Sequence, residues 1–350
     1  MSDVRHFKCP SCGAYLEYLP GTESLLCPYC GITVSAKEVA QAVSQTASQA
    51  EAAPEAQQAA SSDGLKEYHC QSCGAQIVTG ATTAATRCYF CHNPVVLTDR
   101  LSGSFKPDWV IPFAINREEA EKAFETYLSK KKYVDRQVFS REQREMFSGV
   151  YYPYWLGEIS GQAVFDGEGV RTSVSTRGDT VTTTRRYYRV EREGSLTFRN
   201  LFRSALKSND RKLTDGIQPY KLSAMKPFDP LYLSGYLAEM RDVEKDVTAA
   251  DMLDEVKGYT RPLMTQGVRC ESVSGSCTFT PKETLMRYVL LPAWVLTYSS
   301  GGQSYYYLMN AQTGTVCGRL PINRGKLIRS GLAWGAAIAG LLAAGGAFIW

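Results

Sequence analysis

The pattern of apolar and polar residues divides the chain into segments with different periods. Residues 116–133 have the period of an amphipathic helix, because apolar residues return to one face of the segment. These apolar residues are Ala120, Phe124 and Leu128. Asn116 and Glu119 stand three positions apart at the start, as in a capping box. The pattern therefore predicts a helix that begins directly after Asn116.

Further elements follow from the same reading of the middle of the chain. A second helix is expected over about residues 249–264, with Thr248 or its neighbour as its cap. Residues 169–191 alternate around Gly178–Asp179, which predicts a hairpin. Residues 303–321 predict another hairpin, which turns between Asn310 and Gly314.

A short motif recurs in the same region. Pro153 and Trp155 stand in "VYYPYWLGEI", and Pro292 and Trp294 stand in "VLLPAWVLTY". Each copy follows a helical segment and leads into a candidate hairpin, which suggests an internal duplication. The sequence thus predicts the α+β class, with a larger α+β domain over residues 105–320 that contains antiparallel hairpins.

The last twenty residues, 331–350, contain no charged residue. As a helix with a rise of about 1.5 Å per residue, this segment would be about 30 Å long, the thickness of the hydrocarbon core of a bilayer. A tail-anchoring transmembrane helix is therefore expected, and a buried soluble helix is the alternative. Small residues recur every four positions and predict pairing with another membrane helix or with a second copy. These residues are Gly331, Gly335, Ala339, Ala343 and Ala347.

The positive charge of the protein is concentrated beside this segment. The net charge is +4, and the 338 residues outside 319–330 balance, with 35 basic against 35 acidic residues; the twelve residues 319–330 contain no acid and a basic flank of four residues. This flank consists of Arg319, Arg324, Lys326 and Arg329. A cationic flank predicts a single-pass inner-membrane protein with the bulk of the chain in the cytoplasm, in contact with membrane lipid. The N-terminus shows no signal peptide, so the thiols should stay reduced.

Eight cysteines form two sets with identical spacing. Each set is Cys-x₂-Cys-x₁₄-Cys-x₂-Cys, and a shift of 61 residues relates the sets. The first set is Cys9, Cys12, Cys27 and Cys30, and the second set is Cys70, Cys73, Cys88 and Cys91. Four thiolates at this spacing are typical of tetrahedral Zn²⁺. We therefore expect two structural zinc ions, with iron–sulfur or redox dithiol sites as the alternatives.

These sites predict two small zinc ribbons, at residues 5–35 and 66–98, joined by a flexible linker at 36–65 that is rich in Ala, Gln and Ser. A site with four cysteines leaves no open position for substrate, so the metal should be structural. Neither ribbon is basic, so nucleic-acid binding is not expected of the ribbons. A hairpin cluster, Arg185, Arg186 and Arg189 beside Tyr187 and Tyr188, is better explained as a solvated sheet surface than as a nucleic-acid site.

No catalytic constellation is found in the sequence. All three histidines, His6, His69 and His92, lie in or beside the ribbons, so residues 105–320 contain no histidine. This argues against acid–base catalysis near neutral pH in the middle domain. The protein is expected not to be an enzyme.

The order of motifs resembles a known bacterial family. These motifs are "CPSCGA", "DWVIPFAINREEAEKAF", "GVYYPYWL", "MKPFDPLYLSGYLAE", "LLPAWVLTY" and "YYLMNAQTGTVCGRLPINRGKL". The chain is similar, over about residues 5–330, to membrane-attached double zinc-ribbon proteins of the transcription factor IIB type. Some members resemble membrane subunits encoded beside phage-shock protein A homologues. The resemblance implies a partner that is a band-7-like or phage-shock protein A-like cytoplasmic protein. The sequence departs from the family at His92, where a glycine is usual.

The combined expectation is a zinc-ribbon adaptor that recruits partner proteins to the inner face of the cell membrane, as in an envelope-stress response. Other membrane zinc-ribbon subunits are further expected partners. The alternative is a membrane-tethered regulator that binds nucleic acid, for which affinity would fall steeply with salt.

Overall fold

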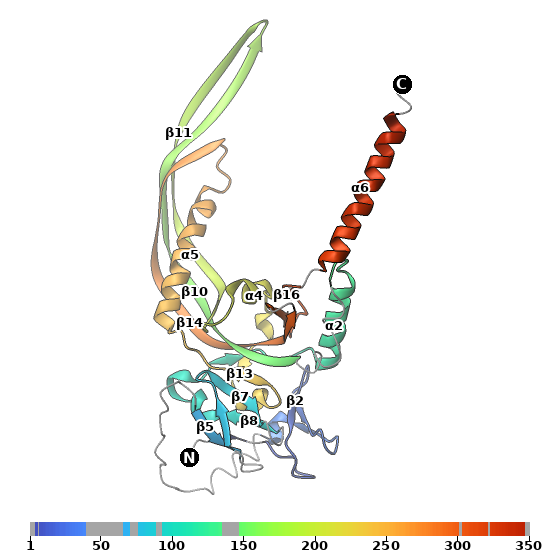
Figure 1. Cartoon of the computed structure of the whole chain (residues 1–350). Helices are drawn as coiled ribbons and strands as arrows, with labels where there is room; N and C mark the ends of the chain where they lie inside the picture. Colours follow the sequence, from blue (N-terminus) through green and yellow to red (C-terminus); the bar gives the residue numbers. More distant parts are fainter. Residues whose placement is uncertain are drawn as a thin grey trace.

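The computed structural model describes residues 4–5, 7–39, 66–70, 76–88, 93–134, 147–300, 303–320 and 323–346. Most of the predicted linker, 36–65, lies outside these ranges. Figure 1 shows a body from which a long β arm and the C-terminal helix both extend away from the N-terminal ribbons.

Three very long antiparallel strands form the arm and the centre of the fold: β10 (Ser148–Arg177), β11 (Thr180–Ser204) and β14 (Ser272–Ser300). β10 lies in the middle and pairs with β11 on one side and with β14 on the other. Gly178 and Asp179 connect β10 to β11, and Gly178 has φ +60°. The predicted turn is confirmed, because glycine takes this φ without the steric cost that a Cβ would bring.

These strands are the centre of an eleven-stranded sheet, most of whose other members are short. Parallel pairing of β10 with β13 and of β14 with β9 makes the sheet mixed. The other strands are β1 (Val4–Arg5), β7 (Thr83–Arg87), β8 (Pro94–Leu97), β9 (Trp109–Val110), β12 (Lys226–Pro227), β13 (Leu237–Glu239), β15 (Gln303–Asn310) and β16 (Val316–Gly318). The predicted turn between Asn310 and Gly314 is confirmed, because it connects β15 to β16.

Two small sheets belong to the ribbons. They consist of β2 (Glu17–Leu19), β3 (Ser24–Leu26) and β4 (Thr33–Ser35), and of β5 (Lys66–His69) and β6 (Gln76–Thr79). Short helical turns punctuate the rest of the chain: η1 (Thr98–Leu101), η2 (Gly103–Phe105), α4 (Arg211–Gly216), η4 (Leu222–Ala224) and η5 (Pro230–Leu233).

The core beneath the sheet is aromatic. Phe113 stacks on Tyr236 with ring centroids 4.0 Å apart, and its ring meets those of Tyr151 and Trp294 edge-on. Phe147 in turn stacks on Trp294 at 5.4 Å. Aromatic pairs of this kind add to the free energy that burial of their apolar area contributes.

The two Pro-x-Trp motifs lie on neighbouring strands of this core. β10 and β14 are antiparallel here, with Tyr151 opposite Pro292 and Pro153 opposite Leu290. Each tryptophan anchors its strand to a loop by an indole N–H bond of 3.0 Å. Trp155 donates to the carbonyl of Val243, and Trp294 donates to the carbonyl of Ile115.

The first predicted helix is confirmed. Helix α2 spans Arg117–Ser129, and Asn116 caps it. The Asn116 side chain accepts from the amide of Glu119, and the Glu119 carboxylate accepts from the amide of Asn116, so the capping box is complete. The three predicted face residues, Ala120, Phe124 and Leu128, are all buried.

The second helix exists, but its predicted start was wrong. Helix α5 spans Lys245–Thr265 and its cap residue is Glu244. Thr248 lies inside the first turn, where its hydroxyl donates to the Glu244 carbonyl. A buried face that includes Met252 and Val256 packs against β10 and β14, and this packing extends the helix beyond its local cap signal.

The prediction of a transmembrane tail anchor at 331–350 was wrong. Helix α6 spans Arg324–Gly346. No helix within the described ranges is both long enough and apolar enough to cross a membrane. α6 begins on a basic segment with Arg324, Lys326 and Arg329, and the uncharged part that follows is built largely of Ala and Gly, which add little apolar surface.

The prediction of the α+β fold class was also wrong, because the described chain is mostly β-sheet. Glycines inside β10 resemble turn signals in the sequence. In the structure they allow close packing within a continuous strand instead. A Cβ at Gly161 would collide with the carbonyl of Thr280, and a Cβ at Gly167 would collide with the carbonyl of Ser274.

Candidate metal centre

Two tight loops bring the first four cysteines together. One loop carries Cys9 and Cys12, and the other carries Cys27 and Cys30. In each loop a glycine amide donates back to the first cysteine carbonyl at 2.9 Å, from Gly13 to Cys9 and from Gly31 to Cys27. Both glycines have positive φ, +73° and +74°. These turns direct both sulfur atoms of a Cys-x₂-Cys pair to the same point.

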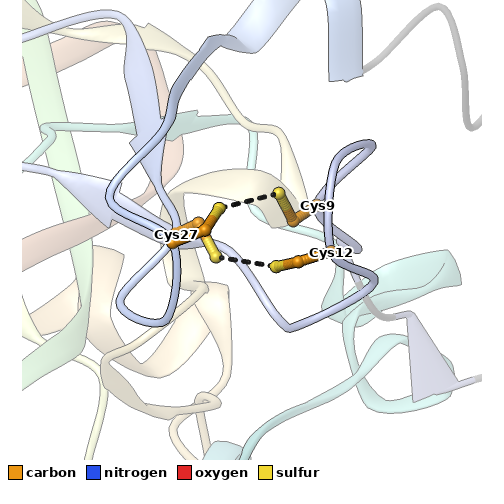
Figure 2. A group of neighbouring side chains, drawn as sticks. Cys9, Cys12 and Cys27 are labelled. Carbon is orange, nitrogen blue, oxygen red and sulfur yellow. Dashed lines mark hydrogen bonds between the residues drawn. The ribbon is translucent and has the colours of Figure 1, made fainter.

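The four Sγ atoms form one compact cluster and all lie within 4.8 Å of one another. The distance is 3.6 Å between Cys9 and Cys30 and 3.5 Å between Cys12 and Cys27. Figure 2 shows Cys9 and Cys12 facing Cys27 across the gap between the loops. Tetrahedral thiolates at about 2.3 Å from Zn²⁺ lie about 3.8 Å from one another, so the donor set and its spacing fit one metal ion.

The electrostatics of the cluster also favour a bound cation. Amide N–H groups of Cys30 and Tyr29 donate to the Cys27 sulfur and lower its pKa to about 7. The amide of Ala14 acts in the same direction on Cys12, but desolvation and the neighbouring sulfurs raise the pKa of Cys12 to about 12. Ionisation of one thiol therefore makes ionisation of its neighbours less favourable. A bound metal ion would offset this repulsion, because thiolates are its ligands.

The first ribbon is packed tightly against the body. Leu16, Tyr18 and Leu25 are at most 4% exposed and belong to the same core as the central sheet. The Tyr18 amide donates to the carbonyl of Ser234 at 3.0 Å, and the Ser234 hydroxyl donates to the carbonyl of Leu16 at 2.5 Å.

Two ion pairs surround this contact. Glu17 pairs with Arg87 at 3.1 Å, and Glu23 pairs with Lys226. The Lys226 ammonium, through its hydrogen bond and its charge, holds the pKa of Glu23 below its ordinary value. Both pairs are partly exposed to solvent, which screens their charges, so they contribute little to stability.

A cluster of four cysteines is coordinatively closed once a metal is bound. Cys9 and Cys27 are buried, whereas Cys12 and Cys30 are exposed. All four tetrahedral positions would be filled by protein sulfur, which leaves no position for a reacting water or substrate. The arrangement can therefore hold a small fold together and does not itself provide a catalytic centre.

The second set of cysteines is only half described. Cys70 and Cys88 are buried in a small cluster with Tyr68, Val95 and Leu97. Cys73 and Cys91 lie outside the described residues, so the second zinc site stays a prediction. His6 and His92 also lie outside them.

Arg100, which no sequence pattern singles out, holds the second ribbon in place through hydrogen bonds. Arg100 is buried, and its Nε donates to the hydroxyl of Tyr68 at 2.6 Å. Its Nη1 donates to the carbonyl of Thr83 at 2.7 Å, and the guanidinium lies 5.1 Å from the Tyr68 ring centroid. A lone arginine in a polar segment carries no pattern that predicts burial, so only the structure reveals this contact.

The predicted basic flank surrounds the start of α6. Arg319 precedes the helix and is exposed, and Arg324 is its first residue. Lys326 and Arg329 follow in the first two turns and are also exposed. Within the described residues, the Ser330 hydroxyl lies 2.9 Å from that of Tyr133, which links this end of α6 to the segment after α2.

The comparisons with known proteins place the chain beside one curated relative. No family model and no solved structure matches it. The uncharacterized protein YdjG of Bacillus subtilis (strain 168) is 31% identical over 339 residues. The aligned region covers 95% of this chain and 94% of the relative, so the similarity extends over nearly the whole length of both proteins. This chain belongs to the same family as YdjG.

Proposed function

We propose that this protein is a non-enzymatic scaffold that binds other proteins, and that zinc ions stabilise its two ribbons. The observation that carries the proposal is the closed cluster of four cysteines in a ribbon that shares its core with the sheet. Such a site stabilises a fold and leaves the surface of the protein to carry the function.

The metal in this proposal is Zn²⁺, with one ion in each ribbon. Four sulfur donors at tetrahedral spacing favour zinc over hard cations, which prefer oxygen ligands. The second ion rests on the repeated spacing of Cys70, Cys73, Cys88 and Cys91. That the scaffold works at the inner face of the cell membrane stays a prediction of the sequence.

The surface available to partners supports the proposal. The β arm exposes large apolar side chains among its polar ones, including Val174, Val181 and Tyr187, each more than 60% exposed. The first ribbon likewise exposes Tyr29 at 85%. Aromatic and aliphatic side chains of this kind are common anchors in protein interfaces.

Affinity purification of the full chain from its native cells, followed by quantitative mass spectrometry, tests the scaffold proposal. The variant Cys12→Ser/Cys30→Ser is compared with Cys270→Ser, which removes a thiol outside both cysteine sets. We expect a reproducible set of proteins with wild type and with Cys270→Ser, unchanged by nuclease, and its loss with the ribbon variant. Absence of any enriched protein, or dependence of the whole set on nucleic acid, would contradict the proposal.

A further inference from the structure

The outer edge of β11 is the longest open strand edge of the described chain. β11 has 25 residues and pairs with β10 alone among the described elements. An open edge presents unpaired N–H and C=O groups that can accept another strand, and proteins usually keep such edges short or covered. This edge is long and, toward its tip, uncovered (Figure 1).

The tip of the arm is a hairpin of only two strands, formed by the end of β10 and the start of β11. Pairing of β10 with β14 ends at Val170, opposite Ser272. Beyond this point β10 and β11 pair as strands only with each other, from Arg171 opposite Arg186 to Arg177 opposite Thr180. At about 3.3 Å per residue, this two-stranded tip is about 20 Å long.

The hairpin register fixes which backbone groups point outward. Arg177 and Thr180 flank a two-residue turn and therefore form a hydrogen-bonded pair. In this hairpin tip, the backbone groups of even-numbered β11 residues then form hydrogen bonds with β10. The N–H and C=O groups of odd-numbered residues point to the open edge. Val181, Thr183 and Arg185 are thus the residues that would bond to an added strand.

The charge of β11 indicates which kind of segment would bind at its open edge. The strand contains six arginines and two glutamates, with no lysine or aspartate. Three of its arginines have acidic partners: Arg203 pairs with Glu255, Arg199 with Glu158, and Arg189 with Asp166 and Glu191. Arg192 instead donates to the carbonyl of Gln266. Within the described part of the chain, Arg185 and Arg186 are both exposed and have no ion pair.

Arg185 and Arg186 are neighbours in a strand, so their side chains project from opposite faces of the hairpin. A strand added to this edge would meet one guanidinium on each face. Carboxylates at the facing positions of that strand would pair with both, and such cross-strand pairs stabilise a sheet. A second copy of β11 would instead bring its own two arginines close to these, which is unfavourable.

From the open backbone and the unpaired arginines, we infer that the outer edge of β11, over residues 180–190, binds an acidic, extended segment of a partner protein as an added strand. The inference rests on the scaffold proposal and deepens it by naming the surface and the partner chemistry. Backbone hydrogen bonds would supply affinity, and the two arginines would supply selection.

A binding titration of the purified full chain tests the charge requirement. The probe is a fluorescein-labelled peptide, Thr-Val-Tyr-Asp-Glu-Val-Thr-Val, compared with the same peptide carrying Lys-Lys in place of Asp-Glu. We expect Arg185→Glu/Arg186→Glu to weaken binding of the acidic peptide by about tenfold or more. The matched control Lys122→Glu/Lys130→Glu makes the same charge change on exposed positions of α2 and at its end, and it should leave binding within about twofold at moderate salt, because a Debye length is only about 8–10 Å.

A second pair of measurements tests the backbone requirement. Thr183→Pro removes one outward N–H without touching the bonds to β10, so it should weaken binding while the melting temperature stays near that of wild type. A peptide N-methylated at alternate positions should also lose binding. Equal binding of the N-methylated peptide, or no effect of Thr183→Pro, would overturn strand addition.

Two other occupants are outcomes that overturn the inference. Tighter binding of a 20-base-pair DNA duplex than of the peptide would make the surface a nucleic-acid site. Concentration-dependent dimers that Arg185→Glu/Arg186→Glu strengthens would make it a self-association site. If purified native partners are retained equally by wild type, Thr183→Pro and Arg185→Glu/Arg186→Glu, the inference fails while the scaffold proposal stands.

Discussion

The amide of Tyr18 in the first ribbon donates to the carbonyl of Ser234, at the end of η5, across 3.0 Å. The hydroxyl of the same Ser234 donates to the carbonyl of Leu16. Because Leu16 and Tyr18 are buried in the core of the sheet, the ribbon is continuous with the body. Loss of metal from the four cysteines should therefore also lower the stability of the sheet.

Removal of metal should destabilise the body as well as the ribbon. Chelation of the purified protein is expected to lower the temperature at which tryptophan fluorescence changes, because Trp155 and Trp294 lie in the core that Leu16 and Tyr18 share. Metal analysis should show about two zinc ions per chain in wild type and about one in Cys9→Ser/Cys27→Ser. Cys270→Ser is the control and should keep both ions. An unchanged tryptophan transition after chelation would show that ribbon and sheet unfold independently.

Loss of the Ser234 hydroxyl should weaken the contact between ribbon and body. Ser234→Ala leaves the buried carbonyl of Leu16 without this donor, so the free energy of unfolding should fall by about 1–3 kcal/mol. Urea unfolding measures the change. Ser208→Ala, at an exposed position, should change the free energy of unfolding by less than about 0.5 kcal/mol. Equal effects of the two substitutions would refute the role of this bond.

Local signals in the sequence were sufficient where a single segment determines its own structure. The capping box at Asn116 and the turn at Gly178–Asp179 follow from residues within a few positions of one another, and the first set of cysteines consists of two such local pairs. Each depends on steric or hydrogen-bonding rules that act locally. The capping box, the turn and the clustering of the first four cysteines were confirmed, and the identity of the metal stays a prediction.

Features that depend on distant segments could not be read in this way. The glycines of β10 are turn signals in isolation, and only the approach of β14 shows that they lie within a strand. The burial of Arg100 depends on Tyr68 and on the carbonyl of Thr83. The membrane prediction relied on the absence of charge in residues 331–350, whereas small residues reduce the apolar character that a membrane span requires.

The capping box of α2 should contribute measurably to stability. Asn116→Ala removes the acceptor for the Glu119 amide and should lower the free energy of unfolding by about 1 kcal/mol. Asn116→Asp keeps an acceptor at the same position and should stay within about 0.5 kcal/mol of wild type. Urea unfolding of both variants separates a capping effect from a general effect of substitution at this site. A loss of stability in Asn116→Asp equal to that in Asn116→Ala would contradict the capping role.

The half-buried carboxyl group of Glu239 in β13 should make stability fall as the pH rises. Desolvation raises the pKa of Glu239 above its ordinary value of 4.5, although a hydrogen bond with Thr82 and the charge of Arg100 oppose this shift. One of its carboxyl oxygens, Oε2, is buried without a hydrogen-bond partner in the described structure. The folded protein therefore holds the Glu239 proton more tightly than the unfolded chain does. This contribution to stability is fully present below pH 4.5 and is lost as the pH rises through the raised pKa.

Glu239→Gln removes the titration and keeps the shape of the side chain. The free energy of unfolding of the variant, relative to wild type, should therefore increase between about pH 4.5 and pH 7. Urea unfolding across this range measures the difference, in which the contributions of other carboxyl groups cancel. A flat difference for Glu239→Gln would mean that this carboxyl has the same pKa in the folded and unfolded states, and a falling difference would mean that its charged form is stabilised on folding.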